Sequence, residues 1–211
     1  MKYLEFYNKL ESMRDKEYIE NFLVYNTSLV IAGVKPAVTI AMKKNNIKLY
    51  SNWNNFGKTF IKRINLEFVE LRESNESIII MIYDETILKK ELNKKENLEF
   101  LIKLGYPHEV ETKEYVNTLK FRYEKYHCPH ELGLFLGIPF KDVKDFMECT
   151  TKKCLLCGYW KVYNDSSKAK TIFNQYDKVK EYTIKNMLEG NLSRDLALSI
   201  KDSFYKNIKY I

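Results

Sequence analysis

The amino-acid sequence predicts an α+β fold, with a single helix-rich domain around a small mixed sheet and a C-terminal helical extension. Along most of the chain, apolar residues recur every three or four positions, as in helices that bury one face. The run Ile78–Tyr83 is continuous, apolar and rich in β-branched residues, and Leu155–Tyr163 is aromatic and β-branched. We therefore expect these two segments to be strands of the sheet.

The first part of the chain divides into short elements. Residues 3–25 place apolar side chains at helical spacing, and Asp15 is positioned to cap the second of two short helices. From Ser28 to Met42 the pattern changes to β-branched and small residues, broken by a glycine and a proline, which predicts a buried, non-helical segment. Residues 47–51 are expected to form a short strand. Four apolar residues then predict one face of a helix: Phe56, Phe60, Ile64 and Phe68.

Helices are expected again after the strand Ile78–Tyr83, which we expect to be central in the sheet. They are predicted over Glu85–Asn93, Glu96–Leu104, Glu111–Tyr126 and Phe140–Glu148. Asn164–Ser167 is placed to cap a long helix that Gly190 ends, and Ser193 to cap a last one. The last helix carries an apolar stripe, Leu196, Ile200, Phe204 and Ile208. We therefore divide the chain into a main domain, 1–188, and a helical extension, 189–211, which is suited to docking on the body or on a second subunit of a homodimer.

The charge balance permits nucleic-acid binding without requiring it. Thirty-five Lys and Arg residues stand against 28 Asp and Glu, which gives a net charge of +7, and the two signs are well mixed. No apolar run approaches the roughly 20 residues that span a bilayer. The N-terminal residues also lack the order of a signal peptide. We expect a cytoplasmic protein with no membrane partner.

The cysteines suggest a metal site. In a cytoplasmic chain they are expected to be reduced thiols or metal ligands. Cys154 and Cys157 form a Cys-x-x-Cys pair, and Cys128 with His127 or His130 can complete a tetrahedral set, so zinc is a candidate cofactor. A single Cys-x-x-Cys is weak evidence for zinc. The Cys-Pro dipeptide at position 128 also occurs in haem-responsive proteins, but a dipeptide alone does not favour haem.

Three blocks of sequence carry a family resemblance: AGVKP at 32–36, PHELGLFLGIPFKDV at 129–143 and GYWKVY at 158–163. In their order and residues they resemble an uncharacterised family of clostridial proteins, domain of unknown function 3793. The resemblance covers roughly residues 20–182 and leaves the helix after Gly190 as an addition. It implies no activity. It does imply that the shared part holds the candidate residues Lys35, His130, Glu131, Trp160 and Lys161.

His130 is the first candidate for acid–base chemistry. It precedes Glu131 and heads an apolar run, so we expect it at the entrance of a buried element, where a neutral imidazole can act as a general base. Cysteine-protease-like acyl transferases and hydrolases place a nucleophile before an early buried segment, then a histidine, then an acidic residue. Here those places are taken by Thr27 or Ser28, His130, and Asp142 or Asp145. Since no cysteine stands at the first place, Cys157 is the substitute nucleophile.

Lys35 and Lys161 each interrupt an apolar segment, where an ammonium group must find a partner or a ligand anion. If both point into one cleft with His130, they form a site for an anionic small molecule or acyl substrate. Tyr159 and Trp160 can wall that cleft. The alternative is that the lysines reach solvent independently.

A helix-turn-helix is a further alternative, with helices over 131–136 and 140–148 and a glycine in the turn. The second helix offsets its two lysines with acidic residues, so nucleic-acid binding is not favoured. The leading hypothesis is an enzyme with His130 as acid or base. Its rivals are a metal- or haem-binding regulator and a nucleic-acid-binding module.

Overall fold

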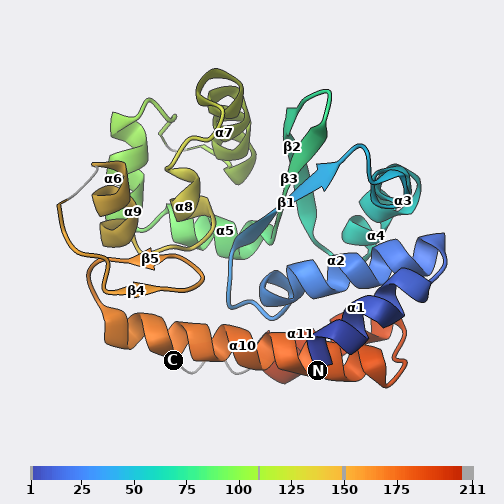
Figure 1. Ribbon diagram of the computed structural model, residues 1–211. Coiled ribbons are helices and arrows are strands. Elements are labelled where there is room, and N and C mark those ends of the chain that lie inside the picture. Colours follow the sequence, from blue (N-terminus) through green and yellow to red (C-terminus); the bar gives the residue numbers. More distant parts are fainter. Residues whose placement is uncertain (1, 109, 149–150, 206–211) are drawn as a thin grey trace.

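The α+β prediction is confirmed in a computed structural model that describes residues 2–108, 110–148 and 151–205 (Figure 1). The first part of the chain forms α1 (Lys2–Ser12), α2 (Asp15–Ile31), β1 (Ala37–Lys43), α3 (Ile47–Asn52), the π-helix η1 (Trp53–Gly57), α4 (Lys58–Arg63), β2 (Glu67–Glu73) and β3 (Ser77–Tyr83). The second part forms α5 (Glu85–Leu92), α6 (Lys95–Lys103), α7 (Thr112–Tyr126), α8 (Leu132–Phe135), α9 (Phe140–Met147), β4 (Leu156–Cys157), β5 (Lys161–Val162), α10 (Ser166–Leu188) and α11 (Ser193–Phe204).

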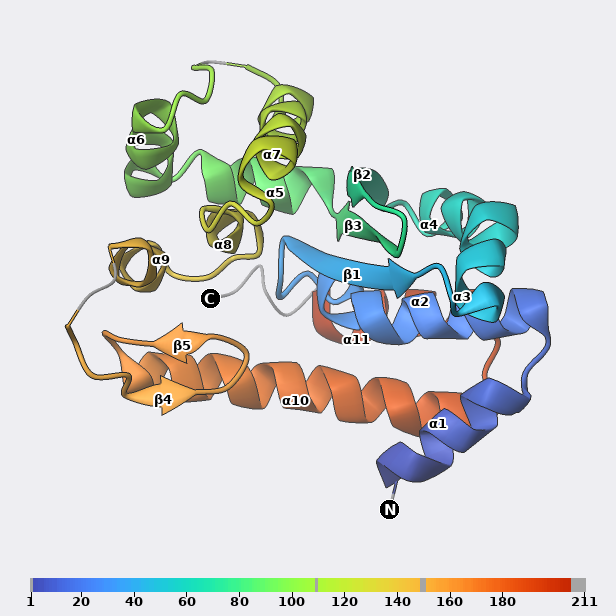
Figure 2. The ribbon, with the colours of Figure 1, turned by 45° about the horizontal axis from the view of Figure 1, so that its top comes forward.

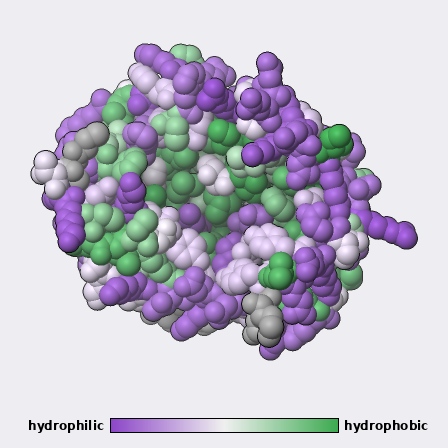
Figure 3. All heavy atoms as spheres, in the orientation of Figure 1, coloured by the Kyte–Doolittle hydropathy of each residue, from purple (hydrophilic) through white to green (hydrophobic). Residues whose placement is uncertain are grey.

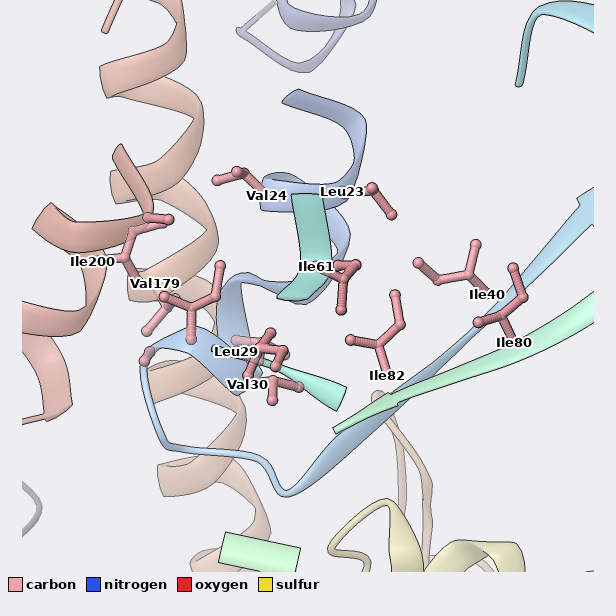
Figure 4. Packing of buried hydrophobic residues seen from close by; sticks show 14 of the residues in the cluster. Leu23, Val24, Leu29, Val30, Ile40, Ile61, Ile80, Ile82, Val179 and Ile200 are labelled. Carbon is pink, nitrogen blue, oxygen red and sulfur yellow. The ribbon is translucent and has the colours of Figure 1, made fainter. Parts of the chain in front are cut away.

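The sheet has the order β1-β3-β2, and both described pairings are antiparallel. The central strand β3 is buried on both faces, which explains why its sequence is continuously apolar rather than alternating. Ile80 and Ile82 face a core with α2, α4, α10 and α11, whereas Met81 and Tyr83 face a second core with α5, α7 and α8. Figure 2 shows these two groups of helices on opposite sides of the sheet, and Figure 4 shows side chains of the first core meeting at β3.

Helix α2 continues to Ile31, so the prediction of a non-helical segment from Ser28 was wrong for its first residues. The β-branched residues there stay helical because they are buried in the first core, and packing outweighs their weak helix propensity. The helix ends at Ile31, two residues before Gly33, whose φ of 74° is a conformation that favours glycine. Arg14, not Asp15, occupies the N-cap position of α2, and Asp15 is its first residue.

Two other local predictions were also wrong. Residues 47–51 are helical because the side chain of Asn46 accepts a hydrogen bond from the backbone N–H of Leu49 at 3.0 Å and caps α3. The apolar row from Phe56 to Phe68 is not one helix, since α4 ends at Arg63 and Phe68 lies in β2. Its four members nevertheless all pack into the first core. The apolar spacing therefore marked burial correctly but did not mark a continuous helix.

The segment Leu155–Tyr163 was predicted to be a strand of the main sheet. Instead, it forms the separate hairpin β4–β5. The hairpin lies between α9 and α10 (Figure 1). Gly158 lies in its turn, where a Cβ atom would collide with the ring of Phe173 from α10. The close approach of the turn to α10 thus requires a glycine and packs the hairpin on that helix.

Helix α11 docks on the body of the protein, against α2 and α10. Of its predicted stripe, Leu196 and Ile200 are buried and Phe204 is half-buried against Tyr182, with 5.4 Å between ring centroids. Ile208 lies outside the described residues. The homodimer through this helix stays a prediction. In the ranges that the structure covers, no helix combines the length and apolar character needed to cross a lipid bilayer.

Candidate functional site

A pocket of about 330 Å³ lies between α8, α9 and the β4–β5 hairpin, and we call it the hairpin pocket. Leu132, Leu136 and Val143 supply apolar lining from the two helices. The predicted site residues that also line it are Cys128, His130, Asp142, Tyr159, Trp160 and Lys161. Figure 3 shows the face seen in Figure 1, which is hollowed near its centre with apolar residues inside the hollow; α8, α9 and the hairpin lie to the left of that centre. The sequence therefore located most of the pocket, including its two separate walls.

His130 and Lys161 both lie beside one aromatic ring, that of Phe146. The imidazole of His130 packs edge-on against Phe146, with 5.0 Å between ring centroids, and the Lys161 ammonium lies 5.8 Å from the centroid of the same ring. His130 and Lys161 are both exposed, and Phe146 is 41% exposed. Within the described ranges, no hydrogen bond fixes the imidazole. The mouth of an apolar pocket thus presents two nitrogen groups that can meet a ligand.

Glu131 has a structural role, contrary to the expectation that it works beside His130. Its side chain is buried and accepts hydrogen bonds from Arg122 Nε and from the hydroxyl of Tyr106, the latter at 3.2 Å. Arg122 also donates to the carbonyl oxygen of Leu104 at 3.1 Å. Burial and the Glu131 carboxylate raise the pKa of Tyr106 well above its ordinary range. This network fixes the turn before α8 and leaves His130 facing outward.

Asp142 touches the pocket, but its oxygens are already fully engaged. They accept hydrogen bonds from Trp160 Nε1 at 2.8 Å, from the backbone N–H groups of Tyr163 and Asn164 at 3.0 and 3.1 Å, and from Asn164 Nδ2 at 2.8 Å. The carboxylate therefore ties α9 to the hairpin and positions the Trp160 ring. Asp145 acts in the same way, accepting from Asn164 Nδ2 at 2.9 Å and from Lys152 at 2.7 Å.

The structure does not bring the expected nucleophiles to His130. Ser28 is wholly buried in α2, and its hydroxyl donates to the carbonyl oxygen of Tyr25 at 2.9 Å. Thr27 is also buried and donates to Leu23 within the same helix. Cys157 is exposed on β4 and does not line the pocket. The thiol at the pocket is that of Cys128, whose sulfur lies 3.9 Å from the Tyr123 hydroxyl oxygen.

The three cysteines of the predicted zinc set do not assemble into a metal site. Cys128, Cys154 and Cys157 are free and exposed, and the Cys154 thiol donates to the carbonyl oxygen of Leu156 at 3.3 Å. In the part of the chain that the structure describes, no group of three or more His, Cys, Asp or Glu side chains is arranged to hold a metal ion. Cys149 lies outside the described residues.

The expected helix-turn-helix does not present a recognition surface. Helix α8 has only four residues, all buried, and α9 directs Asp142 and Asp145 to the hairpin. On the exposed side of α9, Lys144 lies 3.8 Å from Glu148, so its charge is offset locally. Helix α9 carries no Arg, Asn or Gln, which are among the side chains that read base edges most often.

Lys35 does not line the hairpin pocket, so the single cleft expected for Lys35, Lys161 and His130 is divided. Lys35 lies half-buried in the loop between α2 and β1, where burial lowers its pKa to about 8. The sequence reasoning missed Lys180 of α10. Burial and the charge of Lys35 lower its pKa to about 8 as well. The signal available was its position four residues after the buried Tyr176, on the same helix face.

The hairpin also reaches toward this second lysine region. The Tyr159 hydroxyl donates to Asp177 of α10 at 2.8 Å, and its ring packs edge-on against Tyr176 with 4.9 Å between centroids. Tyr159 thus contributes to the hairpin pocket and also contacts the helix that carries Lys180.

Comparison with known proteins supports the resemblance read from the sequence. Residues 23–197 match the model of a family described as "Protein of unknown function (DUF3793)". The match extends into α11, beyond the end expected from the sequence blocks. No curated protein and no solved structure matches the chain. Because the match spans most of the chain and includes the hairpin pocket, this protein belongs to the DUF3793 family.

Proposed function

We propose that this protein binds a small, mostly apolar acid in the hairpin pocket, with the acidic group beside Lys161 and His130. The observation that carries the proposal is the arrangement around Phe146: two nitrogen groups lie beside one aromatic ring that lines an apolar pocket. Small-molecule sites have this character, with mainly apolar walls and a few placed polar groups. The lysine charge selects the acid, and the apolar lining holds its hydrocarbon part.

Calorimetry with a matched ligand pair tests the proposal. Octanoate and 1-octanol share a chain but differ in charge, so we expect octanoate to bind at least about tenfold more tightly. Lys161→Met should remove that difference, and Phe146→Ala should weaken both ligands because it removes the exposed wall of the pocket. Lys144→Met, on the outer side of α9, is the control and should change neither. The proposal fails if neither ligand binds, or if Lys161→Met leaves the preference for octanoate intact.

The catalytic form of the proposal makes His130 the proton donor or acceptor for the bound ligand. A reaction of the acyl-transfer or hydrolysis class would then use Cys128, because it is the thiol that lines the same pocket. We expect slow hydrolysis of p-nitrophenyl octanoate that is lost in both Cys128→Ser and His130→Gln. Cys157→Ser, which changes an exposed thiol away from the pocket, should keep the activity. Turnover that survives Cys128→Ser would exclude this chemistry and leave the binding function in place.

The protein is further proposed to reside in the cytoplasm. The support is that Cys128, Cys154 and Cys157 are free and exposed, a state that reducing compartments maintain. Thiol counting on protein extracted under acid quench from its native cells should find all three alkylated. Disulfide-linked species in that extract would contradict this location.

A further inference from the structure

We propose that Lys35 and Lys180 form a binding site for a small dianion of the phosphate class, where the loop before β1 meets α2 and α10. Neither lysine lines the hairpin pocket, so the site does not depend on the function proposed for that pocket. The inference rests on how the fold brings the two lysines to the same part of the protein and on the finding that, within the described residues, neither forms an ion pair.

The loop that carries Lys35 is held in place on three sides. The backbone N–H of Lys35 donates to the carbonyl oxygen of Leu29 at 3.1 Å, which ties the loop to the end of α2. Pro36 packs so closely on Gly137 that an added Cβ there would lie 2.6 Å from the proline ring. The Tyr176 hydroxyl of α10 donates to the carbonyl oxygen of Val34 at 3.3 Å. The loop is therefore anchored to α10 at the residue next to Lys35.

Lys180 follows Tyr176 by one helical turn, so both side chains lie on the face of α10 that meets this loop and α2. Its ammonium donates to the carbonyl oxygen of Tyr25 at 2.5 Å and lies 4.1 Å from the centroid of the Tyr25 ring. An ammonium has three N–H donors. The carbonyl uses one of them, and the others remain available to a ligand.

The charges in this region are unbalanced. Among the described residues neither Lys35 nor Lys180 forms an ion pair, although both are half-buried. The titratable groups around the two lysines are the phenols of Tyr25, Tyr159 and Tyr176 and the carboxylates of Asp177 and Glu91. Both carboxylates are engaged elsewhere, because Asp177 accepts the Tyr159 hydroxyl and Glu91 pairs with Lys94. Two half-buried positive charges in one region are an unfavourable arrangement unless an anion joins them.

The donors fit a phosphate group. Lysine binds phosphate as a compact point charge, and two lysines match a dianion better than a monoanion. Burial raises the pKa of Tyr25 to about 12, so its hydroxyl stays protonated at neutral pH and adds no negative charge that would compete with phosphate. Phosphate bound here would compensate both lysines at once and would link α2, α10 and the loop before β1.

Calorimetric titration at pH 7 and constant ionic strength tests the site, with inorganic phosphate, phenyl phosphate and acetate as probes. We expect phosphate to bind at least about tenfold more tightly than acetate, and Lys35→Met and Lys180→Met each to weaken phosphate at least about tenfold. Lys180→Arg, which keeps the charge, should retain binding. Lys178→Met removes an exposed charge from the same helix and should bind like the parent protein.

Comparison of inorganic phosphate with phenyl phosphate shows whether the natural ligand is free phosphate or a phosphate monoester. Tighter binding of phenyl phosphate indicates a phosphate monoester, and tighter binding of the inorganic ion indicates free phosphate. Equal binding of acetate and phosphate would overturn the proposal, as would equal weakening by Lys178→Met and Lys180→Met. Near-ultraviolet circular dichroism confirms that each variant is folded. Octanoate binding is measured in parallel, because its loss without loss of phosphate binding would affect only the hairpin pocket.

Discussion

Two regions of this protein bury positive charge, and they treat it differently. At the turn before α8, the Arg122 guanidinium meets Glu131, the Tyr106 hydroxyl and the Leu104 carbonyl oxygen. Near the loop before β1, Lys35 and Lys180 share a half-buried space without a described acidic partner. In the first region the Glu131 carboxylate neutralises the Arg122 guanidinium, so the pair has a structural role. The second leaves its charge uncompensated, which destabilises the fold but provides an attraction for a ligand.

The largest expected loss of stability comes from breaking the ion pair between Arg122 and Glu131. Arg122→Met leaves Glu131 buried without its cation and should lower the free energy of unfolding by about 3–5 kcal/mol. Lys89→Met breaks the exposed pair with Glu111 and should cost about 0.2–1 kcal/mol. Urea unfolding of both variants measures the difference. Equal losses would mean that the Arg122 network has no special structural role.

A smaller loss of stability is expected at Asp142, whose carboxylate accepts hydrogen bonds from N–H groups but has no cationic partner among its described hydrogen bonds. Asp142→Asn keeps the shape but replaces one acceptor oxygen with an NH₂ group, so hydrogen bonds to Trp160 or to the 163–164 backbone are lost. We expect a loss of about 1–3 kcal/mol in the free energy of unfolding. A shift in Trp160 fluorescence should accompany it. A stable variant with unchanged emission would show that the hairpin is held by other contacts.

The smallest expected change is a gain, not a loss, in the free energy of unfolding. Lys180→Met removes an uncompensated ammonium and should raise the free energy of unfolding by about 1 kcal/mol at pH 7 in phosphate-free buffer. The Lys180 pKa is about 8 in the folded protein and 10.5 ordinarily, so between these values the unfolded chain binds more protons and folding becomes more favourable as pH rises. The advantage of the variant should therefore be complete below pH 8 and vanish near pH 10.5.

Urea unfolding of parent and variant across that pH range measures the effect. Tyr25 and Lys35 lie closest to Lys180 among the titratable groups, with Tyr159, Tyr176, Asp177 and Glu91 around them. All of them titrate in both proteins, so the difference between the two curves isolates the lysine. A variant less stable than the parent at pH 7 would show that Lys180 contributes more through its bond to the Tyr25 carbonyl than it costs through its charge.

The sequence predicted burial more reliably than local conformation. The Phe56–Phe68 row packs into the first core, with Phe60 buried and its other members partly buried, and most of the segment after Ser28 is buried or partly buried. However, the row is divided between η1, α4 and β2, and the segment starts as helix. Apolar spacing reports which side chains avoid water, whereas element boundaries depend on caps such as Asn46 and on packing partners from distant parts of the chain.

The candidate site was predicted in part for the same reason. The two blocks that carry His130 and Lys161 do meet at one pocket. The roles of Glu131 and Asp142 could not be read from their positions, because Arg122 and Trp160 reach them only in the folded chain. Lys180 was missed because its partner in the pair, Lys35, is 145 positions earlier, and only tertiary packing brings the two together.

The most direct test of the comparison between the two charged regions follows the lysine ammonium groups themselves by NMR, with lysines labelled at Cε. In phosphate-free buffer Lys35 and Lys180 should titrate near pH 8, and saturating inorganic phosphate should move both titrations upward by about one pH unit or more. The Lys178 signal should not respond to phosphate. Titration curves of Lys35 and Lys180 that are the same with and without phosphate would contradict the account.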